Sequence, residues 1–106
     1  MINSKEKEIV QRFKERVTET LGYRLDRIVL FGSRARGDAE EDSDFDFLVT
    51  VKNPEVDDKE HVRQIAWELS LEYATVITPL VVHGKDFVEE KYFYLHENIH
   101  KEGRVI

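Results

Sequence analysis

Two aspartates at the start of an expected strand have the spacing of a metal site. Asp44 and Asp46 stand two residues apart, so their carboxylates point to the same side of the strand. Neighbouring negative charges repel each other and raise the pKa of one carboxyl unless a cation lies between them. Hard divalent cations such as Mg²⁺ prefer this kind of oxygen pair. The alternative is a solvated acidic edge, because six acidic residues lie within residues 38–46.

A Gly-Ser dipeptide precedes this pair, with ten residues between Ser33 and Asp44. Gly32 follows the apolar run of residues 28–31, and Ser33 is expected to cap a short helix over residues 34–36. Backbone N–H groups and the helix dipole at such a junction favour an anion such as phosphate.

Arg34 and Arg36 lie in the same segment and can hold phosphate oxygens. Metal-binding carboxylates together with a phosphate cradle are the parts of a phosphoryl or nucleotidyl transfer site.

An alternation of helices and strands must position these residues. Apolar residues recur with helical spacing in two long segments, and continuous or alternating apolar residues mark three strands. The order α-β-α-β-α-β-α predicts one α/β (α+β) domain over residues 1–106, with a small mixed sheet of three or four strands flanked by helices. The expected helices are Ser4–Leu21, Arg34–Arg36, Asp57 or Asp58 to Tyr73, and one or two over Asp86–Glu102; the expected strands are Leu25–Phe31, Asp44–Val51 and Thr75–His83.

The middle strand, Asp44–Val51, is expected to be buried on both faces. Apolar side chains occupy every second position on one face, and Leu48 lies with the two aspartates on the other. Ionised carboxylates at the start of a strand buried in this way need a compensating partner, which favours the metal site over the acidic edge. Pro79 indicates that the last strand is an edge strand or carries a bulge.

Composition excludes several other kinds of site. The 106-residue chain has no cysteine, which excludes disulfides, cysteine nucleophiles and cysteine-based metal centres. A net charge of −6 argues against loose binding to nucleic acid, and no direct DNA binding is expected. No apolar run approaches the roughly 20 residues that span a bilayer. We therefore expect a soluble, cytoplasmic protein with no membrane association.

The Gly-Ser and Asp-x-Asp motifs together resemble the signature of a known family. Gly32-Ser33, ten intervening residues and Asp44-x-Asp46 resemble the GS-x10-DxD pattern of the polymerase-β-type nucleotidyltransferases. The string GSRARGDAEEDSDFDFLV, the chain length and the order of elements resemble the minimal nucleotidyltransferases of bacteria and archaea. The resemblance implies a polymerase-β-like nucleotidyltransferase core.

The same resemblance implies a role for each residue of the motif. Gly32-Ser33 would bind the nucleotide triphosphate, with Arg34 and Arg36 beside it. Asp44 and Asp46 would be the catalytic residues and would hold two Mg²⁺ ions, with Mn²⁺ as the substitute. The implied reaction transfers a nucleoside monophosphate, AMP from ATP by analogy with relatives, to an acceptor and releases pyrophosphate.

One ligand of the family's pattern is missing. Catalytic members usually carry a third carboxylate on a later strand, whereas residues 75–82 contain no acid. Thr78 stands at the expected position, and its hydroxyl is a poor substitute. Glu72 and Asp86 are the stand-ins on either side of the strand. This departure leaves open an alternative, a module that binds a nucleotide and a partner with little or no catalysis.

The core uses up the chain, so the acceptor site is expected on another molecule. A second copy of the chain is one source, which would make a homo-oligomer. The resemblance implies another source: a helical HEPN ribonuclease toxin, with this chain as its antitoxin, adding AMP to a tyrosine of the toxin. The acidic half, residues 55–106, and the aromatic segment Tyr92–Leu95 are the surfaces expected to bind such a basic partner.

A second motif competes with the first. Residues His96 to His100 match the H-E-x-x-H pattern of zinc proteases. A catalytic zinc needs a third protein ligand, and the position of the third histidine is Ile106, the last residue. We therefore expect a solvent-facing histidine pair, with adventitious metal binding as the alternative.

The single tryptophan has a structural interpretation. Trp67 is expected in the core or at its rim.

Overall fold

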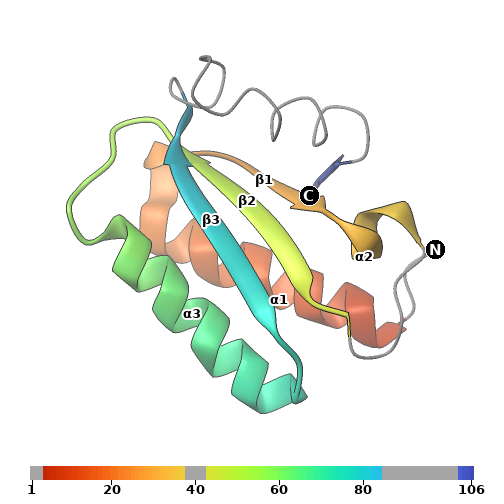
Figure 1. The fold of residues 1–106 in the computed structure, drawn as a ribbon. Coiled ribbons are helices and arrows are strands. Elements are labelled where there is room, and N and C mark those ends of the chain that lie inside the picture. Colours follow the sequence, from red (N-terminus) through yellow and green to blue (C-terminus); the bar gives the residue numbers. More distant parts are fainter. Residues whose placement is uncertain (1–3, 38–42, 85–102) are drawn as a thin grey trace.

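In the computed structural model, which describes residues 4–37, 43–84 and 103–106, a mixed sheet carries two long helices on one face (Figure 1). The sheet order is β3-β2-β1-β4. β1 is antiparallel to both β2 and β4, whereas β2 and β3 are parallel. The strands are β1 (Leu25–Phe31), β2 (Phe45–Val51), β3 (Ile77–His83) and β4 (Arg104–Val105).

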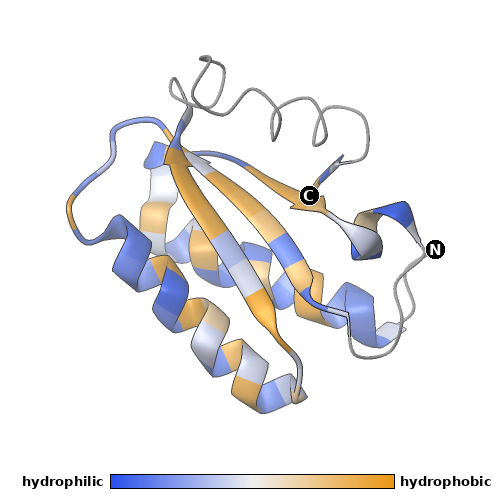
Figure 2. Cartoon of the chain, viewed as in Figure 1, coloured by the Kyte–Doolittle hydropathy of each residue, from blue (hydrophilic) through white to orange (hydrophobic). Residues whose placement is uncertain are grey.

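The two long helices bury one apolar stripe each against the sheet. They are α1 (Ser4–Leu21) and α3 (Asp58–Tyr73). The ring of Phe13 in α1 stacks on that of Phe47 in β2, with 4.1 Å between the centroids. Figure 2 shows hydrophobic residues along β2 and β3, with hydrophilic residues on the outer sides of the helices. The buried apolar residues of the two helices are Ile9, Phe13, Val17, Leu21, Val62, Ile65, Ala66 and Leu69.

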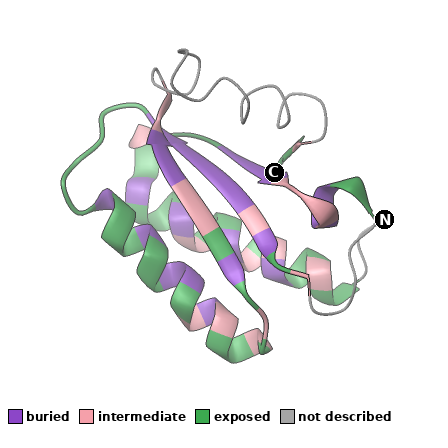
Figure 3. Cartoon of the chain, viewed as in Figure 1, coloured by how far each residue is buried: buried purple, intermediate pink, exposed green. Residues whose placement is uncertain are grey.

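β2 is buried on both of its faces. Phe45, Phe47 and further alternate residues belong to the main core under the helices. Leu48 belongs to a second, smaller cluster on the other face, with Val29 and Val82. Figure 3 shows β2 buried over almost its whole length, with a half-buried position near its start. The predicted division of this strand into two faces is therefore confirmed.

The predicted mixed sheet and its flanking helices are also confirmed. α1 has the predicted bounds, and Pro79 lies on β3, which is an edge strand of the sheet. β3 starts at Ile77, two residues later than expected, because the chain leaves α3 through Ala74 in the left-handed conformation. The prediction of three or four strands allowed a fourth, but the position of β4 was not predicted, and the one or two helices predicted over Asp86–Glu102 lie outside the described residues.

A buried ion pair joins the start of β1 to the start of α3. Arg24, in the 3₁₀ turn η1 (Gly22–Arg24), donates through Nη1 and Nη2 to the two carboxylate oxygens of Asp58, at 2.6 and 2.9 Å. Asp58 also accepts the backbone N–H of Glu55 at 2.7 Å. These hydrogen bonds hold the pKa of the Asp58 carboxyl below its usual value, and the hydrogen bond from Arg24 has the largest effect.

Among the residues that the structure describes, no helix combines the length and the apolar character that a membrane span requires.

Candidate nucleotide and metal site

The Gly-Ser turn lies against the start of β2. β1 and β2 are antiparallel with Phe31 paired to Asp46, so the residue after Phe31 turns back beside the carboxylate. Gly32 has a φ of 76°, and a Cβ built on it would lie 2.5 Å from Oδ2 of Asp46. Glycine is therefore needed here both for its backbone conformation and for the space. The two motifs predicted to act together are in contact at this point.

A single helical turn, α2 (Ser33–Arg36), follows Gly32. The N–H groups of Ala35 and Arg36 both donate to the Gly32 carbonyl at 3.1 Å, and Gly37 ends the helix in the left-handed conformation. The expectation that Ser33 caps the helix is wrong. Gly32 is the cap, and the helix begins one residue earlier, at Ser33, without a side-chain cap hydrogen bond. Ser33 is half-buried.

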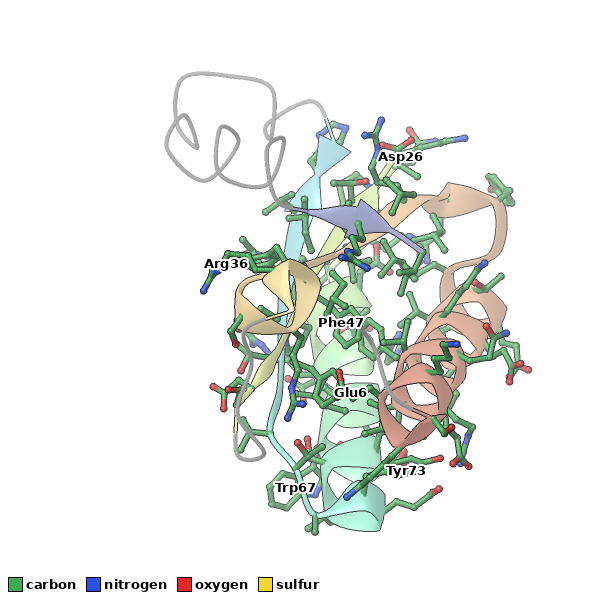
Figure 4. All side chains as sticks on the ribbon, turned by 90° about the vertical axis from the view of Figure 1, so that its right-hand side faces the viewer. Glu6, Asp26, Arg36, Phe47, Trp67 and Tyr73 are labelled. Atoms are coloured by element: carbon green, nitrogen blue, oxygen red, sulfur yellow. The ribbon has the colours of Figure 1, made fainter. Side chains whose placement is uncertain are left out.

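The two arginines of α2 differ in their surroundings. They are two residues apart on a helical turn, which places their side chains on roughly opposite sides. Arg34 is 7% exposed and donates through Nε and Nη2 to the Ser43 carbonyl, at 3.2 and 2.8 Å. Arg36 is exposed, and Figure 4 shows its side chain extending away from α1. The structure thus surrounds Arg34 with protein groups, whereas both Arg34 and Arg36 were expected from the sequence to hold phosphate oxygens.

The charges around Asp46 suit a bound cation. Burial raises the pKa of the Asp46 carboxyl, the charge of Asp44 raises it further, and the charge of Arg36 lowers it. Asp44 is exposed at the surface. A divalent cation held by Asp44 and Asp46 would remove this repulsion, so the two side chains fit a Mg²⁺ site.

A third carboxylate is absent from the site in the part of the chain that the structure describes. No group of three acidic or histidine side chains that could hold a metal occurs among residues 4–37, 43–84 and 103–106. Thr78 is the parallel-strand partner of Asp46, and it is exposed. Because directly paired residues point to the same face of a sheet, the Thr78 side chain lies next to that of Asp46.

Other sequence candidates lie elsewhere. Glu72 forms an ion pair with Arg12 of α1 on the helical side of the sheet, which argues against its service as a third metal ligand. Asp86 lies outside the described residues, as do His96, His100 and the segment Tyr92–Leu95. Trp67 is 60% exposed, which excludes it from the core.

Sequence reasoning missed three features of the site. The first is the contact of Gly32 with the Asp46 carboxylate. The sequence signal that could have indicated this contact is the occurrence of the Gly-Ser and Asp-x-Asp motifs together. The second is the attachment of Arg34 to Ser43, because the spacing of α2 does not reveal which arginine turns inward. The third is the contact of Glu6 of α1 with Arg34, and no sequence signal connects these two residues.

Comparison with protein families gives a match over nearly the whole chain. The family described as "Nucleotidyltransferase domain" matches residues 6–106. Two proteins of Methanocaldococcus jannaschii, each named "Putative protein adenylyltransferase", are similar in sequence. One is 43% identical over 75 residues, which are 70% of this chain and 76% of the relative. The other is 33% identical over 101 residues, which are 95% of this chain and 97% of the relative.

Solved structures share the fold at low sequence identity. A structure described as a toxin-antitoxin with AMP-PNP has a TM-score of 0.62 at 16% identity, over 88% of this chain and 68% of that chain. A structure described as a "putative minimal nucleotidyltransferase" has a TM-score of 0.61 at 20% identity, over 92% of both chains.

Proposed function

Because this chain belongs to the nucleotidyltransferase domain family, we propose that it transfers AMP from ATP to a hydroxyl group of a protein acceptor. The observation that carries the proposal is the contact between Gly32 of the Gly-Ser turn and the carboxylate of Asp46. Nucleotidyl transfer needs a triphosphate and a divalent cation side by side, and this contact joins the residues suited to each. The names of the archaeal relatives support an adenylyl group and a protein acceptor.

The residues divide into two groups by what they would bind. Asp44 and Asp46 would hold Mg²⁺, or Mn²⁺ in its place, as expected for a family that is generally metal-dependent. Gly32 and Ser33 would face the triphosphate through their backbone, and the exposed Arg36 would contribute a positive charge. When bound, the divalent ions would lower the pKa of the acceptor hydroxyl and neutralise the triphosphate.

The transfer balances without any further reactant. The acceptor oxygen forms a bond to the α-phosphorus of ATP. The bond from the α-phosphorus to the oxygen that bridges it to the β-phosphorus breaks. Pyrophosphate leaves with the electron pair, and the hydroxyl proton passes to solvent. The charges of Asp44 and Asp46 would keep cations at this position, and the glycine at residue 32 leaves room for the Asp46 carboxylate beside the Gly-Ser turn.

A second candidate function is a nucleotide-binding module with little or no catalysis. The observation that favours it is Thr78, a hydroxyl beside Asp46 where the family's pattern has a carboxylate. Both functions predict ATP binding with Mg²⁺, and they differ in turnover. Pyrophosphate that accumulates over many turnovers with an acceptor would exclude the module, whereas binding without pyrophosphate would exclude the enzyme.

We further propose that the acceptor is a tyrosine of a HEPN-type toxin, with this chain as the antitoxin. The likeness of the fold to solved toxin-antitoxin structures supports this partner. The acidic character of the chain also suits a basic, RNA-cleaving protein, because opposite charges favour association.

Transfer of a labelled nucleotide tests the proposed function. The chain is co-expressed with the protein encoded beside it, and the purified pair is incubated with α-labelled ATP and Mg²⁺ or Mn²⁺. We expect label on the partner, and the double variant Asp44→Asn with Asp46→Asn should lower it by at least about 100-fold, because both metal-binding charges are gone.

Asp57→Asn provides the matched control, because Asp57 is exposed at the start of α3 and makes no side-chain cap hydrogen bond. This variant should transfer label at the wild-type rate. Equal labelling by the double variant would contradict the site. A neighbour that is neither toxic nor retained by this chain would contradict the toxin partner and leave the family membership untouched.

A further inference from the structure

Arg34 connects the two halves of the candidate site. Its guanidinium donates twice to the carbonyl oxygen of Ser43, the residue immediately before Asp44. Its Cζ also lies 4.4 Å from the ring centroid of Phe45, the residue immediately after Asp44. Arg34 therefore contacts the chain on both sides of Asp44.

These contacts fix the direction of the Asp44 side chain. The planar guanidinium fork orients the Ser43 carbonyl, and that carbonyl belongs to the peptide plane that leads into Asp44. Phe45 is buried in the main core beneath the guanidinium. Because side chains alternate along an extended chain, Asp44 and Asp46 are then directed to the face opposite Phe45.

Glu6 of α1 holds the guanidinium in this place. Its carboxylate lies 3.4 Å from Nη1 of Arg34, and both side chains are largely buried, with 14% and 7% exposed. Figure 4 shows Glu6 near α2. Burying a charge costs free energy unless the charge is paired, so the carboxylate of Glu6 stabilises the buried guanidinium of Arg34. The link spans three elements: α1, α2 and the start of β2.

Gly32 and the α2 residue Arg34 thus contact the chain at the start of β2 at two points, one on each face. Gly32 touches the Asp46 carboxylate on the face away from the helices, and Arg34 contacts Ser43 and Phe45 on the helical side. The geometry points to Arg34 as a positioning residue for the metal-binding carboxylates, anchored by Glu6, and not as a ligand of phosphate. This inference rests on the proposed function, because it assigns Asp44 and Asp46 to a cation.

Manganese titration without nucleotide separates the two roles of Arg34. Arg34→Lys keeps the positive charge and loses the fork that donates twice to one carbonyl. We expect Mn²⁺ binding, measured by electron paramagnetic resonance, to weaken about 10-fold, as for other residues that orient metal ligands. ATP binding in EDTA should change less than about twofold. Weakened ATP binding in EDTA with unchanged Mn²⁺ affinity would instead make Arg34 a phosphate ligand and overturn the inference.

Two further variants complete the test. Arg16→Lys is the matched control, because Arg16 is ion-paired with Glu68 on the outer surface of the helices, away from the carboxylates, and it should bind Mn²⁺ like the wild type. Glu6→Gln removes the anchor and keeps Arg34, and it should weaken Mn²⁺ binding several-fold. If Arg34→Lys does not fold, as judged by circular dichroism and thermal melting, Glu6→Gln decides, and wild-type Mn²⁺ affinity in a folded Glu6→Gln protein overturns the inference.

The aspartate variant separates this inference from the proposed function. Asp44→Asn with Asp46→Asn should abolish Mn²⁺ binding. If that variant binds Mn²⁺ like the wild type, the proposed function itself fails. If it loses Mn²⁺ while folded Arg34 and Glu6 variants retain it, the carboxylate site stands and the positioning role of Arg34 falls.

Discussion

Gly32 shows how tightly single residues constrain the site. Its φ of 76° and the 2.5 Å from a hypothetical Cβ to Asp46 Oδ2 are two separate constraints. Gly22 shares the first constraint, with a φ of 59°, and has no atom within 4 Å of its hypothetical Cβ. The two glycines therefore allow backbone strain to be separated from contact with the carboxylate.

Gly32→Ala should lose both stability and metal binding. The backbone conformation alone should lower the free energy of unfolding by about 1–3 kcal/mol. The added methyl group must also push the Asp46 carboxylate aside, so Mn²⁺ binding should weaken. Gly22→Ala should lose about 1 kcal/mol and bind Mn²⁺ like the wild type. Urea unfolding and Mn²⁺ titration of both variants check this, and tight Mn²⁺ binding by Gly32→Ala would contradict the described contact.

Asp46 is expected to reduce stability when no cation is bound. Burial and the charge of Asp44 raise the pKa of its carboxyl in the folded protein. A raised pKa means that the stability contributed by the protonated form is present at low pH and is lost as the pH rises through the folded pKa. Asp46→Asn should therefore be more stable than the wild type at pH 7 in EDTA, as measured by urea unfolding. Asp57→Asn should show no such gain, and a less stable Asp46→Asn protein would contradict the electrostatic account.

At the scale of elements, periodic segments were predictable and contacts between elements were not. The helical spacing of apolar residues predicted α1 with its observed bounds, and the alternation in β2 predicted its two faces. β4 has two residues, too few to show any period, and its pairing with β1 depends on the folded backbone. The candidate carboxylates were predictable from their spacing, whereas the inward turn of Arg34 depends on where Ser43 and Glu6 lie in space.

The ion pair of Arg24 and Asp58 fastens α3 to the start of β1. Asp58→Asn leaves Arg24 without its bidentate partner, and the buried position should make the loss roughly 2 kcal/mol in the free energy of unfolding. Because the pKa of Asp58 is lowered, its stabilisation is present above the unfolded pKa and is lost as the pH falls through the folded pKa. The deficit of the variant should therefore shrink in acid.

Urea unfolding of the wild type and Asp58→Asn at pH 7 and pH 3 measures this effect. Glu68→Gln, which breaks an exposed ion pair with Arg16, should lose far less stability at pH 7. A deficit of Asp58→Asn that stays constant down to pH 3 would mean that the carboxylate charge is not the source of the stability.

At the scale of the whole molecule, the candidate site lies at one end of the sheet. β1 ends there, and β2 and β3 begin there. α1 and α3 cover the face of the sheet opposite to the side chains of Asp46 and Thr78 (Figure 1). The face under the helices therefore forms the core, and the neighbouring positions Asp46 and Thr78 lie on the face that the two long helices do not cover. The enzyme and the binding module both depend on this arrangement, and they differ in what happens after ATP is bound.

Calorimetry of ATP binding tests that shared claim most directly. We predict that the wild-type chain binds ATP with Mg²⁺ and loses most of its affinity for ATP in EDTA. Asp44→Asn with Asp46→Asn should bind weakly in both conditions, and Asp57→Asn should match the wild type. Wild-type affinity for ATP and Mg²⁺ in the double variant, or an affinity that Mg²⁺ does not change, would contradict a metal-dependent nucleotide site at the Gly-Ser turn and the aspartate pair.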